Sequence, residues 1–64
     1  MTRNEQLWGI FANAQVENAR LALVMAKLPK PRSPSELHET EGMQRRLAKN
    51  HDVMRDCREQ LQQL

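Results

Sequence analysis

This sequence of 64 residues contains few of the residues that small proteins use to brace a core. It has one cysteine, Cys57, so an internal disulfide and a cysteine-based zinc site are both excluded. Its aromatic residues are Trp8 and Phe11, which leaves leucine, methionine, alanine and valine to form the core. A chain this short buries only about 60% of its extended surface. We therefore expect a marginal monomer, or a core shared with another chain.

Long apolar segments are also missing. The longest uninterrupted apolar run, residues 21–26, is far too short to cross a membrane, so no membrane partner is expected. The N-terminus lacks the charged-then-apolar pattern of a signal peptide, which predicts a cytoplasmic protein. Ten basic residues against eight acidic ones give a net charge of +2, too balanced to require nucleic acid.

Residues arranged for chemistry are scarce. The sequence contains no glycine-rich phosphate loop and no Ser/His/Asp set. His38 and Glu41 lie about one helical turn apart, but two ligands are too few for a metal site. Cys57 falls on an apolar helix face, which favours a small buried hydrophobe over a nucleophile. We therefore expect a protein that is not an enzyme and that has no catalytic residue, metal or cofactor.

Proline is confined to residues 29–34, and neither flanking segment contains any. Three prolines within six residues cannot continue a helix. Alternating β-branched residues are absent, so strands are not expected. The sequence predicts one all-α domain over residues 1–64: a helix at about 3–28, a turn at 29–33 and a second helix at about 34–63. A connector this short makes the two helices antiparallel neighbours.

Both predicted helices begin with a capping signal. Thr2 stands three residues before Glu5, which is the spacing of a capping box. Ser33 stands three residues before Glu36 and is followed by Pro34, which suits the first helical position.

Apolar residues in each helix recur at steps of four and three, the spacing of a heptad seam. The seam of the first helix comprises Leu7, Phe11, Ala14, Asn18, Leu21, Met25 and Leu28. The seam of the second comprises Met43, Leu47, Asn50, Met54, Cys57, Leu61 and Leu64, and the rest of that helix is interpreted as charged or polar. These residues are expected to form the core of the hairpin and of its dimer.

The first helix carries a second apolar stripe, formed by Trp8, Ala12, Val16, Ala19, Leu23 and Ala26. One neighbouring helix cannot cover both faces. A symmetric homodimer in which two hairpins form a four-helix bundle solves this problem. A monomeric hairpin that binds a different partner through its exposed face is the alternative. The seam asparagines Asn18 and Asn50 either set the register of the bundle or lie near water at its edge.

The sequence offers only a few candidate residues for contact with a partner. Arg45, Arg46 and Lys49 form one basic cluster, and Lys27, Lys30 and Arg32 form another at the bend. A solvated face of mixed charge is the competing interpretation of the first cluster, because acidic residues interleave with it. Glu41–Arg45 and Arg55–Glu59 have the spacing of ordinary helix-surface ion pairs. Trp8 is either a core residue or an anchor for a partner. The partner-binding candidates are Trp8, Arg32, Arg45, Arg46 and Lys49.

The start Thr2-Arg3-Asn4-Glu5, together with the two-helix plan across the chain, resembles the Rop family of plasmid copy-number control proteins. That resemblance implies a dimer of helical hairpins that binds paired RNA loops. Size, the two-helix plan and the lack of catalytic residues also make the chain similar to small phage-encoded host-takeover proteins of the quorum-sensing anti-activator type. That resemblance implies a dimer that binds a host regulatory protein.

The expected function is that of a cytoplasmic, homodimeric inhibitor or adaptor, of phage or mobile-element type, that binds and blocks a host protein such as a transcriptional regulator. A Rop-like dimer that binds RNA or DNA is the alternative. A purely structural assembly or coiled-coil fragment is a third possibility.

Overall fold

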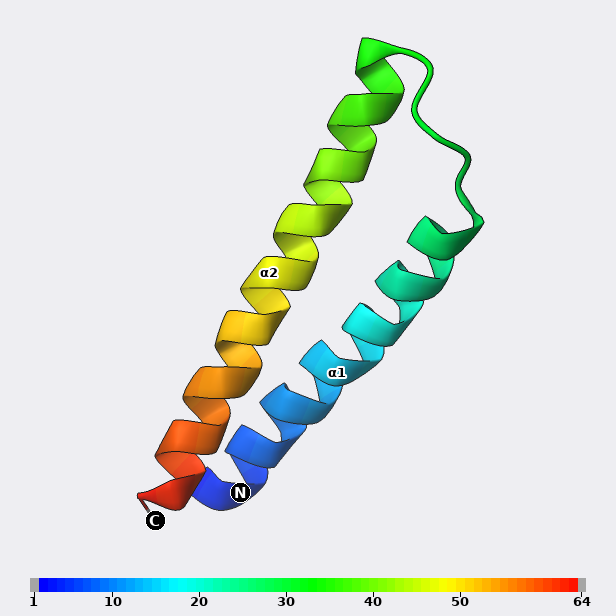
Figure 1. Cartoon of the computed structure of the whole chain (residues 1–64). Coiled ribbons are helices and arrows are strands. Elements are labelled where there is room, and N and C mark those ends of the chain that lie inside the picture. Colours follow the sequence, from blue (N-terminus) through cyan, green and yellow to red (C-terminus); the bar gives the residue numbers. More distant parts are fainter. Residues whose placement is uncertain (1, 64) are drawn as a thin grey trace.

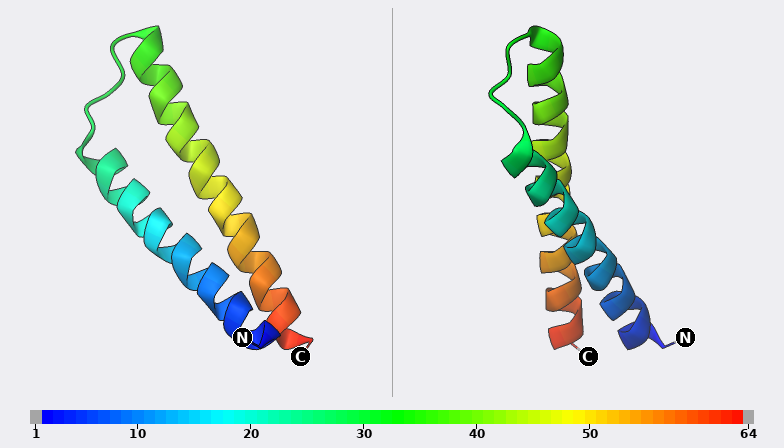
Figure 2. Two further views of the ribbon diagram at one scale, coloured as in Figure 1. Left: turned by 180° about the vertical axis from the view of Figure 1, so that it is seen from behind. Right: turned by 90° about the vertical axis from the view of Figure 1, so that its right-hand side faces the viewer.

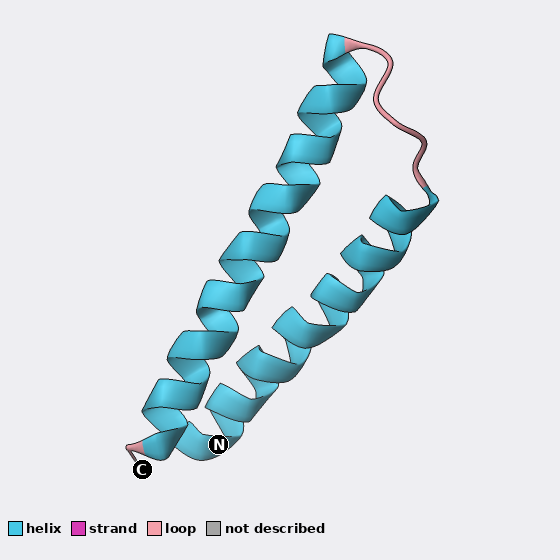
Figure 3. Cartoon of the chain, in the orientation of Figure 1, coloured by secondary structure: helices cyan, strands magenta, loops and turns pink. Residues whose placement is uncertain are grey.

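The computed structural model describes residues 2–63 as two helices joined by an extended connector (Figure 1). Helix α1 spans Arg3–Lys27 and helix α2 spans Pro34–Gln62, and the chain reverses between them so that the start of α1 lies beside the end of α2. Figure 3 shows only helix and loop in this part of the chain. The predicted all-helical hairpin is confirmed. Leu64, assigned to the second seam, lies outside the described residues.

Both helix starts use the predicted side chains. The Thr2 hydroxyl accepts a hydrogen bond from the Glu5 backbone N–H at 3.2 Å, and the Ser33 hydroxyl accepts one from the Glu36 N–H at 3.2 Å. The Glu36 carboxylate also reaches back and accepts the N–H of Arg32 at 2.7 Å. These contacts satisfy backbone donors that have no partner within the helix.

Helix α1 ends one residue earlier than the sequence predicts. Leu28 is its C-cap with an extended backbone (ψ 137°), and its N–H donates to the Met25 carbonyl at 3.3 Å. Pro29 follows directly, and a proline excludes helical geometry at the residue before it, which explains the end point. Leu28 is exposed in the hairpin, so the structure gives no support to its place in the hairpin seam.

The helices cross rather than lie parallel. In Figure 1 the ribbons separate toward the connector, whereas the perpendicular view in Figure 2 separates them toward the termini. A shallow crossing is the geometry expected when heptad seams pack together. Two exposed side-chain pairs link the helices in this antiparallel register: Arg3 Nη2 donates to Gln60 Oε1 at 2.6 Å, and Arg46 Nε lies 4.0 Å from Glu17 Oε1.

The core of the hairpin is thin and follows the predicted seams. The buried residues are Leu7, Ala14, Asn18, Leu21 and Cys57. The other seam positions are half-buried: Phe11, Met25, Met43, Leu47, Asn50, Met54 and Leu61. The spacing of four and three therefore identified the faces that the two helices turn toward each other.

Among the described residues, three large exposed apolar side chains lie off both predicted stripes. Ile10 and Val24 are exposed on the other flank of α1, and Leu37 is exposed near the start of α2. Val53 is half-buried beside the α2 seam. The interpretation of α2 outside its seam as charged or polar was therefore wrong at Leu37 and Val53.

Candidate interaction surfaces

The seam between the helices contains polar groups without partners. Asn18 is 9% exposed, and neither its Nδ2 nor its Oδ1 has a hydrogen-bond partner within the described chain. Asn50 Nδ2 is in the same condition. A buried amide without a partner costs about 1–3 kcal/mol. An apolar side chain at either position would therefore avoid this cost.

The outer face of α1 presents the second apolar stripe to solvent. Trp8 is 53% exposed, Val16 53% and Leu23 62%, and the alanines between them, Ala12 and Ala19, are also exposed. Ala26 continues the same face. We call these six residues the outer stripe. The prediction that α2 covers only one side of α1 is confirmed for the single chain.

Trp8 is about half exposed and lies at the edge of this stripe. Its ring meets Phe11 edge-on, with centroids 5.7 Å apart and an angle of 75° between the planes. Trp8 also lines an open hollow with Arg58, Leu61 and Gln62 from the end of α2. The tryptophan therefore contacts the seam residue Phe11 while about half of its surface remains exposed.

The total exposed area of the hairpin is large for its mass. The chain exposes 5,245 Å², whereas a folded protein of 7.5 kDa exposes about 4,250 Å². The excess is about 1,000 Å², and a standard interface takes about 800 Å² from each partner. Relative to an extended chain of about 10,900 Å², the hairpin buries only about half of its surface. A single hairpin therefore has enough surplus surface for one further interface.

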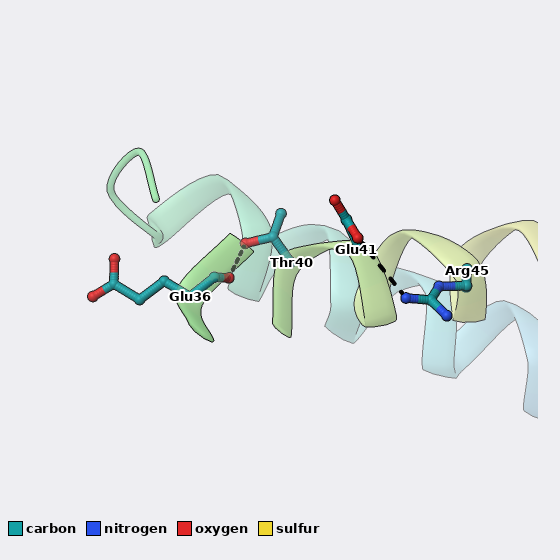
Figure 4. Close-up of polar contacts among 4 residues, drawn as sticks. All are labelled: Glu36, Thr40, Glu41 and Arg45. Carbon is teal, nitrogen blue, oxygen red and sulfur yellow. Dashed lines mark hydrogen bonds and ion pairs between the residues drawn. The ribbon is translucent and has the colours of Figure 1, made fainter. Parts of the chain in front are cut away.

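The basic residues of the α2 cluster are largely matched by acidic neighbours. Arg45 Nη2 lies 4.0 Å from Glu41 Oε2 within the same helix (Figure 4), and Arg46 pairs with Glu17 of α1. All four side chains remain substantially exposed, so each pair contributes little stability. Lys49 is exposed on the same helix. The Glu41–Arg45 pair was predicted from its spacing, and the pairing of Arg46 across the hairpin was not.

Arg55 differs from its predicted pairing. Its guanidinium lies 3.2 Å from Asp52 and 3.5 Å from Asp56, rather than against Glu59. Spacings of three and four are both within reach on a helix, and here the guanidinium takes the side that offers two carboxylates.

The bend forms a separate surface that combines apolar and basic groups. An open hollow is lined by Lys30, Pro31, Arg32, Ser33, Pro34 and Leu37, and most of its lining is apolar. Arg32 is fixed at its backbone by the contact with Glu36, while its side chain is exposed. We call this surface the bend surface. It brings together the predicted contact Arg32 and Leu37, which sequence reasoning missed because a single apolar residue near a helix start belongs to no stripe.

The described residues offer neither a metal-binding cluster nor a membrane-spanning helix. Between residues 2 and 63, no group of three or more His, Cys, Asp or Glu side chains is placed to hold a metal ion. Neither α1 nor α2 is long and apolar enough to cross a membrane.

Comparisons with known proteins add no relative. The chain matches no protein-family model, no curated protein and no solved structure.

Proposed function

We propose that this chain is a non-enzymatic, homodimeric helical-hairpin protein that acts as an inhibitor or adaptor by binding another protein. The observation that carries the proposal is the exposed outer stripe on a hairpin with about 1,000 Å² more exposed surface than its mass predicts. An apolar face of this kind marks an interaction site. Covering it with a second copy gives a four-helix bundle in which the outer stripes are central.

In this dimer, α2 and the bend surface remain outside and are available to a partner. The bend surface supports a protein partner because its prolines and Leu37 offer apolar contacts beside the cations Lys30 and Arg32. An acidic protein segment with apolar side chains complements this chemistry. The α2 arginines support the proposal less strongly, because Glu41 and Glu17 already neutralise Arg45 and Arg46. A host transcriptional regulator is the proposed target class, and occlusion of its working surface is the proposed mechanism.

The experiment is affinity capture from a host lysate with the full chain immobilised, with and without nuclease treatment. A double variant, Lys30→Glu with Arg32→Glu, is compared with the wild type and with Arg55→Glu, a charge-reversal control on α2. We expect a nuclease-resistant protein that the wild type and the control retain and the bend variant loses. Recovery of RNA or DNA alone, with a steep dependence on salt, would instead support the nucleic-acid alternative.

A further inference from the structure

We propose that two copies of the chain pair through their outer stripes in an antiparallel, twofold-symmetric arrangement that places the two bend surfaces at opposite ends of the dimer. This inference rests on the dimer proposed above and specifies its geometry. The occupant of the outer stripe is a second copy of this chain. The axis of symmetry passes near Glu17 and Asn18.

The outer stripe alternates large and small side chains in a self-complementary order. When a second copy runs antiparallel, one register places Leu23 opposite Ala12 and Val16 opposite Ala19. The same register brings Trp8 to within one residue of Ala26, so each large side chain meets a small one or lies beside it. A parallel arrangement would instead place Trp8 on Trp8 and Ala12 on Ala12, which leaves both crowding and gaps.

The stripe also has the spacing and extent of an interface. From Ala12 to Ala26 its residues step alternately by four and three, which keeps a seam facing a partner helix, and Trp8 lies four residues before Ala12 at the edge of that seam. The proposed register overlaps about twenty residues of α1, or roughly 30 Å. The surplus exposed area of about 1,000 Å² per copy matches the roughly 800 Å² that each partner of a standard interface buries.

The opposite flank of α1 is a poorer candidate for the dimer interface. It offers Ile10 and Val24, but Asn13, Glu17 and Arg20 lie between them along the helix. Glu17 is already engaged by Arg46 of α2. A second copy seated there would meet polar groups along most of its contact, whereas the outer stripe is apolar from Trp8 to Ala26.

The functional consequence concerns the number and placement of partner sites. Each hairpin is about 48 Å long and has its bend at one end. An antiparallel dimer therefore presents one bend surface at each end and binds two partner molecules that do not contend for space. A parallel dimer would crowd both bend surfaces at the same end.

The test uses cysteine cross-linking in a Cys57→Ser background. Three variants are compared: Ala12→Cys, Leu23→Cys, and both together. In the antiparallel register, residue 12 of one copy lies opposite residue 23 of the other, while like residues are separated by about 16 Å along the axis. We expect a short thiol cross-linker to join the double variant into covalent dimers and to leave both single variants largely unlinked. Cross-linking of each single variant would overturn the antiparallel arrangement.

A second measurement leaves the interface untouched. A spin label at Lys30→Cys, in the same background, reports the distance between the two bends in the dimer. The antiparallel arrangement places the labels roughly 40 Å apart, whereas a parallel bundle places them within about 20 Å. Sedimentation of the background protein separates the two proposals. A dimer with the short distance overturns the geometry alone, and a monomer overturns the proposed dimer as well.

Discussion

At the scale of single residues, the seam asparagines are the clearest departure from what stability alone would select. Asn18 occupies a heptad position between Ala14 and Leu21, both buried, yet its amide atoms have no hydrogen-bond partner among residues 2–63. An apolar side chain at that position would pack without a desolvation cost. A polar residue at one seam position commonly fixes register, because misaligned packings would bury it against apolar groups.

Asn18→Leu is therefore expected to raise the free energy of unfolding by about 1–2 kcal/mol while loosening the specificity of association. Thermal unfolding measures the first effect, and sedimentation measures the second as species other than the dimer. Asn13→Leu is the matched control, because Asn13 is exposed and its replacement removes no buried polar group. A less stable Asn18→Leu protein that remains a uniform dimer would contradict this account.

Several residue-level features follow from spacing alone. The caps at Thr2 and Ser33 were predictable because a hydroxyl three residues before a glutamate has one local partner to bind. The choice of Arg55 between neighbouring carboxylates was not predictable, because positions at three and four residues are about equally accessible on a helix. The Arg46–Glu17 pair required the register between helices, which local spacing does not contain.

At the scale of elements, the two helices differ in how they are stabilised. Helix α2 contacts α1 through one seam and is otherwise largely exposed to solvent. Its intrinsic helical propensity therefore contributes more to its stability than it would in a buried helix. Gly42 is its weakest residue in that respect. A β-carbon built at Gly42 would meet no atom within 4 Å.

Gly42→Ala is accordingly expected to increase the free energy of unfolding by about 0.5–1 kcal/mol, since it adds helical propensity without a clash. The mirror substitution, Ala48→Gly at an exposed position of the same helix, is expected to lose a similar amount. Thermal or urea unfolding monitored by circular dichroism compares the two. Destabilisation by Gly42→Ala would indicate that this side of α2 is covered in the assembled protein.

Helix α1 allows a sharper comparison between its two flanks. Leu23, 62% exposed, lies on the outer stripe, and Val24, 48% exposed, lies on the opposite flank. Leu23→Glu should dissociate the dimer by placing a charge in the proposed interface, whereas Val24→Glu should leave it intact. Sedimentation of both variants at equal concentration measures the difference. The reverse pattern would assign the interface to the flank that carries Ile10 and Val24.

At the scale of the whole molecule, the hairpin could be predicted from the sequence and its assembly could only be inferred. The confined prolines and the two seams were sufficient to predict the fold, because each helix has one apolar seam that packs against the other helix. Helix α1 has a second apolar face, and no neighbour within the described chain covers it. What covers this second face depends on contacts between molecules, which the sequence of one chain does not specify. The hairpin alone buries only about half of its extended surface, below the roughly 60% typical of folded domains of this length.

A shared core makes the melting temperature depend on concentration, because dissociation accompanies unfolding. Each tenfold dilution removes about 1.4 kcal/mol from a dimer. With an unfolding entropy of about 2.1 cal/mol/K per residue over both copies, we expect the melting temperature to fall by about 5 °C per tenfold dilution. Circular dichroism in cuvettes of different path length measures this change in melting temperature. The cross-linked Ala12→Cys/Leu23→Cys dimer is the control, since a covalent dimer melts independently of concentration. A wild-type protein that behaves like this control would be a self-sufficient hairpin, and its outer stripe would need another occupant.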